Sequence, residues 1–408
     1  MQNLEEIINA SNVDLMSVFN KLDEIEFNNT EKVLDAFNEF KISEAHLQGT
    51  TGYGYGDIGR EAVENIFAKV FKGEDAIVRS QFISGTQTIS TCLFGILRPG
   101  DTVLSINGKP YDTLDEVLGV VDNPSSLKAW GVKYEQVELK DGKFDISAIV
   151  ERVSKNDIKL IICQRSRGYL YRDAFTIEEL ENIFSEIRKV NNTAFIMTDN
   201  CYGEFTDVRE PLEVGADIIV GSLIKNPGAG IAKTGGYIVG KKQLIDLISD
   251  RYSAPGLGKE GGASFNHNRE ILQGFFMAPH TVNQALKIAC FSAYCLEKLG
   301  YEASPKYDAK RSDIVQMIKF QDPDKLIKYC QGIQAKSPID SHVKPMPWDM
   351  PGYTDQVVMA SGAFVAGSSI EISCDGPIRP PFVAYQQGGL TYQSGKIAVL
   401  NAIRSILD

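Results

Sequence analysis

The sequence is poor in the residues that build disulfides and structural metal sites. Its 408 residues include seven cysteines, an odd number with no CxxC pair, and only four histidines. No histidine stands at metal-ligand spacing from another histidine or from a cysteine. We therefore expect reduced cysteines and no bound metal.

Long apolar runs and clustered positive charge are also missing. No run approaches the roughly 18 residues of a membrane span, and the segment from Met1 to Glu6 lacks the basic-then-apolar layout of a signal peptide. The net charge of −11 argues against nucleic acid or an anionic membrane surface as a partner. A hydrophobic content of 43% is ordinary for a globular protein. We expect a cytoplasmic protein that acts on a small molecule.

The middle of the chain alternates between strand-like and helix-like patterns. We expect three parts: a helical arm (1–50), a large α/β domain (51–280) and a small α+β domain (281–408). In the large domain, strand-like apolar runs lie at 76–78, 102–106, 159–163, 194–197, 217–222 and 236–239. Helix-like runs separate them, which predicts a mainly parallel sheet covered on both faces. The clearest helix, 177–190, follows the capping-box pair Thr176 and Glu179.

The small domain shows a different pattern. Helices are predicted at 282–299, 325–333 and 394–407, with strands at 314–320 and 369–373 and a loop-rich stretch at 337–353.

Two polar residues stand where apolar strands of the large domain end. Lys225 follows the run 216–224 and precedes Asn226-Pro227-Gly228, and Asp199 ends the run that begins at Ala194. Ligands of such sheets bind outside the carboxyl ends of the strands. An amine in an apolar setting can form a Schiff base with an aldehyde cofactor. A nearby carboxylate can balance a pyridinium nitrogen, so this pair suits pyridoxal phosphate (PLP).

Further candidates lie upstream of this pair. Ser84-Gly85-Thr86 follows a strand-like run and opens a helix, which suits a phosphate. The alternative is an ordinary N-cap. Tyr111 could stack on a flat ring or be a packed surface tyrosine. Asp199 could be a plain N-cap, and Lys225 a solvated loop lysine. Their order along the chain favours a cofactor site.

That order resembles the fold-type I PLP enzymes, especially the cystathionine γ-synthase and methionine γ-lyase group. Within it, the chain is most similar to the branch called methionine γ-lyase-like or "aluminium resistance" protein. The resemblance covers nearly the whole chain past residue 45. The segments that carry it are Gly49-Thr50-Thr51-Gly52-Tyr53-Gly54-Tyr55-Gly56-Asp57-Ile58-Gly59-Arg60-Glu61, Gln164-Arg165-Ser166-Arg167-Gly168-Tyr169, Asp199-Asn200-Cys201-Tyr202-Gly203-Glu204-Phe205, Gly221-Ser222-Leu223-Ile224-Lys225-Asn226-Pro227-Gly228 and Trp348-Asp349-Met350-Pro351-Gly352-Tyr353.

The resemblance implies a fold and a set of residue roles. The fold is a seven-stranded, mainly parallel sheet with a smaller carboxyl-terminal domain. Lys225 would be the lysine that binds PLP, and Asp199 the partner of the pyridinium nitrogen. Tyr111 would stack on the ring. The phosphate would be held by Ser84, Gly85, Thr86 and Ser222.

Two departures from the group affect the predicted site. The group carries a Tyr-x-Arg whose arginine reaches a neighbouring subunit's phosphate. Here that arginine position reads Gly54, between Tyr53 and Tyr55, and we take Tyr55 as a catalytic candidate. The group also places a substrate-carboxylate arginine in its last strand, where this chain reads Val383-Ala384-Tyr385. Arg379 is the nearest candidate.

The resemblance implies a carbon–sulfur lyase that removes a β- or γ-thiol from an amino acid such as cystathionine or methionine. It also implies a homo-oligomer, a dimer or a tetramer, with active sites shared between subunits. The alternative is a protein that keeps the PLP fold but performs other amino acid chemistry or a stress or metal-resistance binding role.

Two other motifs match only in part. The segment 54–59 fits GxGxxG, but the dinucleotide fingerprint needs a strand before it and residues 31–40 look helical. Ser222 and Lys225 fit the SxxK of serine acyl-enzymes, with 233–235 as KTG and 198–200 as an imitation of SDN. That order is wrong, and SxxK should open a helix instead of closing a strand.

Overall fold

The computed structural model describes residues 4–350 and 355–407, which form two compact units. The large unit contains residues 32–223 and 234–273. The small unit contains the described residues of 4–31, 224–233 and 274–407. The three-part division expected from the sequence stays a prediction.

The large unit is built on the seven-stranded sheet that the resemblance implied. Six strands run parallel, and β7 alone lies antiparallel, between β1 and β6. In spatial order the strands are β1 (Asp75–Arg79), β7 (Gly236–Gly240), β6 (Ile218–Ser222), β5 (Phe195–Asp199), β4 (Leu160–Gln164), β2 (Thr102–Ser105) and β3 (Lys133–Gln136). The six predicted strands are therefore confirmed, each within two residues.

Register in this sheet brings the ends of three strands together. Gln164 of β4 pairs with Asp199 of β5, and Asp199 pairs with Val220 of β6, two residues before Ser222. Because parallel strands end at the same edge, these polar residues share one edge of the sheet.

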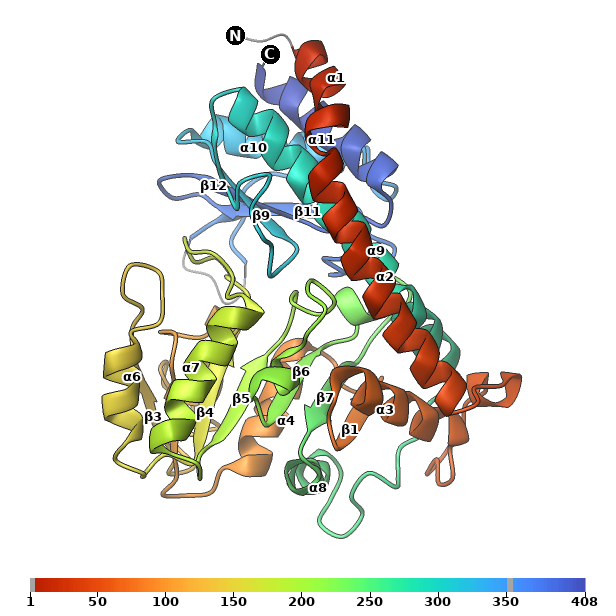
Figure 1. The fold of residues 1–408 in the computed structure, drawn as a ribbon, viewed down its shortest axis with the longest axis vertical. Helices are drawn as coiled ribbons and strands as arrows, with labels where there is room; N and C mark the ends of the chain where they lie inside the picture. The colour runs from red at the N-terminus through yellow and green to blue at the C-terminus, as the bar shows by residue number, and fades with distance from the viewer. Residues whose placement is uncertain (1–3, 351–354, 408) are drawn as a thin grey trace. The chain divides into compact units, whose positions relative to one another are not determined.

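Helices cover both faces of the sheet, as the alternating pattern predicted. Buried residues of α4 (Gly85–Ile96) and α8 (Lys242–Tyr252) form one apolar core, and those of α6 (Ile146–Val153) and α7 (Ile177–Val190) form the other. Figure 1 shows α6 and α7 on one side of the strands. The strands β4, β6 and β7 are buried along their whole length, which explains their uninterrupted apolar sequences.

Two helices show why the sequence patterns were informative. The predicted helix 177–190 is confirmed as α7, and Thr176 and Glu179 form the expected capping box. In α3 (Ile58–Phe71), Val63, Ile66, Phe67, Val70 and Phe71 recur at helical spacing and are all buried.

The remaining elements of the large unit are short. They are η1 (Glu44–Leu47), η2 (Asp112–Leu114), α5 (Asp115–Leu118) and η3 (Pro211–Val214).

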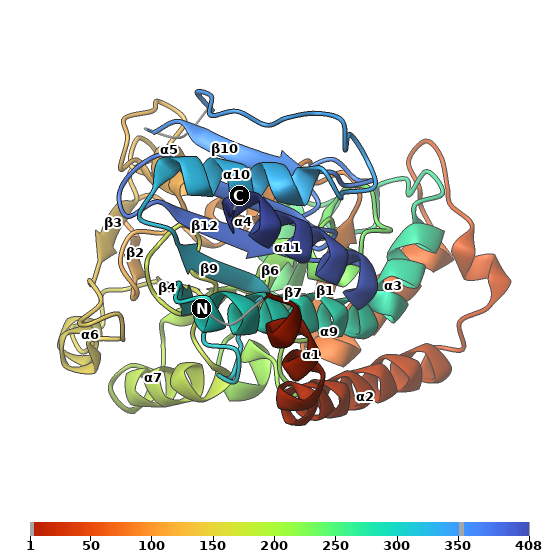
Figure 2. The ribbon, with the colours of Figure 1, turned by 90° about the horizontal axis from the view of Figure 1, so that it is seen from above.

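The small unit has an antiparallel sheet of five strands. In spatial order they are β10 (Val357–Ser361), β11 (Ser373–Pro377), β12 (Val383–Gln387), β9 (Val315–Lys319) and β8 (Glu302–Ser304). The helices α10 (Pro323–Gln334) and α11 (Tyr392–Leu407) pack against each other beside it (Figure 2). The unit also holds α1 (Leu4–Asp14), η4 (Asn226–Gly228) and parts of α2 (Met16–Glu39) and α9 (Asn268–Lys298).

One predicted strand of the small unit is wrong. Residues 369–371 form a turn, and β11 begins only at Ser373. The loop before it bends because Gly367 has a φ of +80° and the Glu371 carboxylate accepts hydrogen bonds from the Phe364 and Val365 N–H groups. A short apolar run is therefore not enough to predict a strand. In the quoted Trp348–Tyr353 segment, 351–353 lie outside the described residues.

Candidate active site

The predicted phosphate-binding residues lie together in the large unit. A Cβ built on Gly85, the first residue of α4, would lie 3.6 Å from Ser222 Cβ and 3.9 Å from Cys201 Sγ. The start of α4 therefore faces both the end of β6 and the turn that follows β5. The absence of a side chain at Gly85 leaves a small cradle between them.

The first turn of α4 is arranged as an N-terminus that can receive an anion. Ser84 is the N-cap, and its Oγ accepts a hydrogen bond from Gln87 N at 3.0 Å. Thr88 Oγ1 donates to the Ser84 carbonyl at 2.8 Å. The N–H groups at the start of a helix have no partner within it and carry the positive end of the helix dipole. Those of Gly85 and Thr86 belong to this set.

Asp199 stands at the end of β5, half-buried, with its carboxylate turned back onto its own loop. Asp199 Oδ1 accepts from Cys201 N at 3.1 Å. Burial raises the pKa of the Cys92 thiol on α4, and the negative charge of Asp199 adds to that rise. The negative charge of Asp199 at the end of β5 therefore affects the pKa of a thiol on α4, the helix whose first residue forms the cradle.

A buried polar network supports the turn after Asp199. The guanidinium of Arg165, fully buried, donates to Asn200 Oδ1 and to the Gly203 carbonyl, both at 2.9 Å. It also lies 3.5 Å from the Glu210 carboxylate, which accepts from Asn200 Nδ2 at 2.9 Å. Burial raises the pKa of Glu210, and the Arg165 charge opposes that rise. The network fixes the path of the chain from 199 to 210.

Tyr111 is held beside the same strand ends by Gln164. The Tyr111 N–H donates to Gln164 Oε1 at 2.8 Å, and Gln164 Nε2 donates to the Ser166 carbonyl at 3.1 Å. A Cβ on Gly168 would lie 3.3 Å from the Tyr111 ring, so this glycine allows the ring to approach closely. Sequence reasoning missed Gln164 as a site residue. A polar residue at the end of a buried strand was the signal that could have found it.

The loop that carries Tyr55 is anchored at its base and exposed at its tip. The rings of Tyr53 and Tyr55 stack with centroids 5.9 Å apart, and their exposed fractions are 81% and 60%. Gly54 between them has a φ of +64°. A Cβ there would lie 2.6 Å from the Ala263 backbone. Glycine is therefore required at this position.

Asp57 anchors the base of that loop. Its carboxylate accepts from Arg60 N at 2.9 Å, Thr50 Oγ1 at 2.5 Å, Asn268 Nδ2 at 3.0 Å and the Ser264 hydroxyl. Burial acts to raise the pKa of Asp57, but these hydrogen bonds outweigh it and lower the pKa below its ordinary value. The GxGxxG-like segment is thus a capped loop that follows η1, and residues 4–53 contain no strand.

Lys225 belongs to the small unit and follows Ser222 by three residues. It is half-buried and immediately precedes η4, and its carbonyl accepts from Gly228 N at 3.1 Å. Ser222 ends a strand, so the SxxK motif does not open a helix here.

Arg379 lies in the small unit just after β11. Its side chain is 50% exposed and forms an ion pair with Asp355 at 3.0 Å. Its assignment to the substrate carboxylate stays a prediction.

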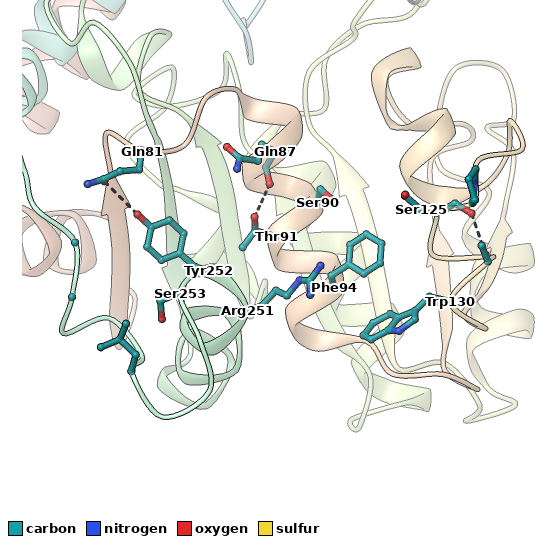
Figure 3. Close-up of a pocket in the computed structure, with 16 residues that line it drawn as sticks. Gln81, Gln87, Ser90, Thr91, Phe94, Ser125, Trp130, Arg251, Tyr252 and Ser253 are labelled. Atoms are coloured by element: carbon teal, nitrogen blue, oxygen red, sulfur yellow. Dashed lines mark hydrogen bonds between the residues drawn. The ribbon is translucent and has the colours of Figure 1, made fainter. Parts of the chain in front are cut away.

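The outer face of α4 lines a separate pocket of about 940 Å³ in the large unit. Phe94 lies at its centre, with its ring 5.3 Å from that of Trp130 and 5.3 Å from the Arg251 guanidinium carbon (Figure 3). Gln87, Ser90, Thr91 and Phe94 face this pocket. The cradle and the buried side chains of Thr88 and Cys92 lie on the opposite face of α4, so this pocket is distinct from the candidate site.

Among the residues that the structure describes, no group of three or more His, Cys, Asp or Glu side chains is placed to hold a metal ion. None of the described helices is long and apolar enough to cross a membrane.

Comparison with known proteins places the chain among sulfur amino acid enzymes. A model of the methionine γ-lyase family matches residues 4–407. The protein YnbB of Bacillus subtilis (strain 168) is 50% identical over 398 residues, which cover 97% of this chain and 94% of YnbB.

The chain also superposes closely on solved structures of similar proteins. A carbon–sulfur lyase involved in aluminium resistance from Clostridium novyi NT superposes with a TM-score of 0.95 at 47% identity, covering 99% of this chain and 96% of that one. A candidate cystathionine β-lyase involved in aluminium resistance from Listeria innocua gives 0.96 at 49% identity, covering 99% of each chain. At 17% identity, the PLP-dependent protein YhfS of Escherichia coli shares the fold, with a TM-score of 0.62 over 95% of this chain and 97% of that one.

Proposed function

Because this chain belongs to the methionine γ-lyase family, we propose that it is a PLP-dependent carbon–sulfur lyase. Its substrate would be a sulfur amino acid such as cystathionine or methionine. The bond between sulfur and Cβ or Cγ would break, a thiol would leave, and water would then release a keto acid and ammonia. The observation that carries the proposal is the cradle formed by Gly85, Ser222 and Cys201 beside the end of β5.

The residues of the cradle fit the phosphate of PLP. A group at Gly85 would lie beside the first turn of α4 and the side of Ser222. Helix dipole, amide donors and hydroxyls together are a common way to hold a phosphate. We assign phosphate binding to Ser84, Gly85, Thr86 and Ser222, and ring stacking to Tyr111.

Asp199 and Lys225 are assigned the proton-holding roles. When bound, PLP supplies an electron sink that stabilises negative charge on the substrate's Cα. The Asp199 carboxylate would keep the ring nitrogen protonated. The Lys225 amine would bind the aldehyde of PLP and, once displaced by substrate, remove the Cα proton as a general base.

The exposed tyrosine pair supports a shared active site. Tyr53 and Tyr55 project from an anchored loop, at the position where the resemblance to the cystathionine γ-synthase group implies a contact with a neighbouring subunit. We therefore keep a homo-oligomer of two or four chains, with Tyr55 completing the partner's site, as part of the proposal. A cytoplasmic location is likewise proposed.

A screen of the PLP-loaded protein against sulfur amino acids tests the activity. Cystathionine, methionine and cysteine would each be mixed with the protein while keto acid, ammonia and thiol are measured. Equal amounts of the three products from at least one substrate are expected. If none of these substrates gives keto acid, the lyase assignment is wrong.

The Lys225→Ala variant tests the cofactor linkage. It should lose the visible absorption that PLP shows when bound to a lysine amine, along with activity. Lys233→Ala is the matched control, because this exposed lysine lies in the same segment. It should keep both the absorption and the activity, and retention of the absorption by Lys225→Ala would remove that residue from its role.

A further inference from the structure

The pocket on the outer face of α4 is lined by side chains that the proposed function does not use. Its sixteen lining residues all belong to the large unit. Most come from α4, from the end of α8 with the turn after it, and from the segments 124–130 and 261–262. Its volume of about 940 Å³ lies within the range of small-molecule sites. We call this space the α4 pocket.

The α4 pocket contains a positive group and no negative one. The chain has 53 acidic residues against 42 basic ones, yet none of the sixteen lining residues is Asp or Glu. Arg251 is the one lysine or arginine among them, and its guanidinium carbon lies 5.3 Å from the centre of the Phe94 ring. Within the described residues, this guanidinium forms no ion pair or hydrogen bond. The carboxylate of the neighbouring Asp250 accepts from Gly256 N at 3.2 Å instead.

Three more lining side chains carry donors without a protein partner. Gln87 Nε2, the Ser90 hydroxyl and Trp130 Nε1 donate to no other group in the ranges 4–350 and 355–407. A cation in the last turn of a helix is common by itself, and exposed donors can bond to water. Donors gathered around an unpaired guanidinium, with no carboxylate beside them, favour an anionic ligand over a cationic one.

Two aromatic rings form the apolar part of the α4 pocket. The half-buried Phe94 ring lies 5.3 Å from the ring of Trp130, which is 39% exposed. Figure 3 shows Arg251, Phe94 and Trp130 next to one another. Flat rings stack on indole rings and on guanidinium planes. A flat ligand ring would thus stack on Trp130 while an anionic group on it pairs with Arg251.

We propose that the α4 pocket binds a small planar anion, an aromatic ring that carries a phosphate or a carboxylate group, and that this ligand changes the affinity for PLP. The binding step is independent of the proposed function, whereas the effect on PLP rests on it. A nucleotide and an aromatic acid share this chemistry, and the experiments below separate them.

Gln87 connects the α4 pocket to the candidate phosphate site. Its backbone N donates to Ser84 Oγ at 3.0 Å, and its Oε1 accepts from Ile83 N at 2.7 Å. A ligand that accepts a hydrogen bond from Gln87 Nε2 would therefore act on the residue that holds the two positions before Gly85. Coupling between two binding sites is reciprocal, so PLP would change the ligand's affinity by the same factor.

The first experiment measures binding to the PLP-loaded protein, in which the cradle is already filled. Adenosine monophosphate and indoleacetate supply a ring joined to a phosphate or to a carboxylate, and adenosine and inorganic phosphate supply the separate parts. By calorimetric titration, at least one ring anion should bind about tenfold more tightly than adenosine or phosphate. The tighter of the two ring anions identifies the anionic group. If neither saturates the protein below about 1 mM, or if phosphate alone binds as tightly, the proposal is wrong.

Two variants locate the binding site. Arg251→Gln should weaken binding of the ring anion about tenfold because it removes the charged donor, and Trp130→Ala should weaken it by a similar factor because it removes the stacking ring. Lys242→Gln is the matched control, since it removes a positive charge from the first turn of the same helix, outside the pocket. It should bind as tightly as the wild type. An equal loss in Lys242→Gln, or no loss in Arg251→Gln, would overturn the assignment to this pocket.

The second experiment measures PLP binding by its visible absorption, with and without saturating ring anion. The Kd for PLP should change about fivefold in the wild type and stay constant in Arg251→Gln. An unchanged Kd in the wild type would overturn the effect on PLP. So would an equal weakening in both proteins, because that result indicates competition at the cradle. These titrations involve no turnover, so if they succeed while no sulfur amino acid gives keto acid, only the lyase assignment fails.

Discussion

The two sheets of this protein gather their polar residues in different ways. In the large unit, strands β4, β5 and β6 run parallel, so Gln164, Asp199 and Ser222 meet at one edge because of register alone. In the small unit, neighbouring strands are antiparallel and their ends alternate between two edges. There the unsatisfied hydroxyls of Ser368 and Ser369 come from a loop, while Ser373 and Asp375 belong to strand β11.

The polar residues of the two sheets are also stabilised in different ways. The strand ends of the large unit are supported by a dense network of buried hydrogen bonds around Arg165 and Gln164. On the small sheet, burial dominates: it raises the pKa of Asp375 to about 7, although Gln387 Nε2 donates to its carboxylate at 3.1 Å. The polar residues at the parallel strand ends are thus held by buried hydrogen bonds, whereas burial has the larger effect on Asp375 of the antiparallel sheet.

Breaking the network under the parallel edge should have the largest effect. Arg165→Met removes a buried charge and leaves Glu210 without its cation, which should lower the free energy of unfolding by about 3–5 kcal/mol. Denaturant titration measures this change. Arg152→Met, which removes a more exposed arginine paired with Glu135 and Asp157, should cost no more than about 1 kcal/mol. Similar losses in both variants would contradict the role given to the network.

On the antiparallel sheet, replacing a buried polar residue should raise the free energy of unfolding instead of lowering it. The pKa of Asp375 is higher in the folded chain than in the unfolded one, so the folded state binds this proton more tightly. Its stabilising contribution is complete below the unfolded pKa and is lost as pH rises to about 7. Asp375→Asn should therefore stabilise the protein by about 4 kcal/mol at about pH 8 and have little effect at about pH 4. Unfolding measured at both pH values tests this, and equal effects at the two would refute it.

Gln164 connects the network to the cofactor site. Gln164→Leu removes the acceptor for Tyr111 N and the donor to Ser166, so the predicted stacking ring loses its support. PLP should bind about tenfold more weakly, a change of about 1.4 kcal/mol. Titration of the visible absorption with added PLP measures it. Tyr111→Phe keeps both the backbone hydrogen bond and the ring, so it should bind PLP nearly as well as the wild type. A loss confined to Tyr111→Phe would exclude a role for Gln164.

The smallest expected effects come from replacing two helix N-caps of the large unit. Ser84 caps α4 at the strand-end site, and Thr176 caps α7 elsewhere. Each substitution by alanine should lower the free energy of unfolding by about 1 kcal/mol. Only Ser84→Ala should also weaken PLP binding. Equal PLP affinity in the two variants would show that Ser84 is an ordinary cap.

Sequence patterns predicted the large unit better than the small one for a physical reason. Strands buried on both faces are continuously apolar, so β1, β2, β4, β5, β6 and β7 stood out. The edge strand β3 reads Lys-Tyr-Glu-Gln and has partly exposed side chains, so it gave no signal. In the small sheet the pattern predicted β9 but not β8, β10 or β12, and the apolar run before Ser373 forms a turn beside Glu371.

Only part of the candidate site could likewise be predicted from the sequence. The positions of Asp199 and Ser222 at strand ends followed from local pattern, because the apolar runs stop there. The roles of Gln164 and Arg165 did not, since they depend on contacts with residues more than 30 positions away in sequence. Such contacts become visible only when register has brought the strand ends together. The roles assigned to Lys225, Tyr55 and Arg379 stay predictions.

The stacked pair of Tyr53 and Tyr55 gives this protein an internal optical reporter. Both rings are largely in solvent in the single chain, on a loop whose base is fastened by Asp57 and whose turn permits only glycine at position 54. Tyrosine absorbance and quenching respond to transfer of the ring out of water. In the homo-oligomer proposed above, dilution would expose these phenols as the subunits separate, without any added label.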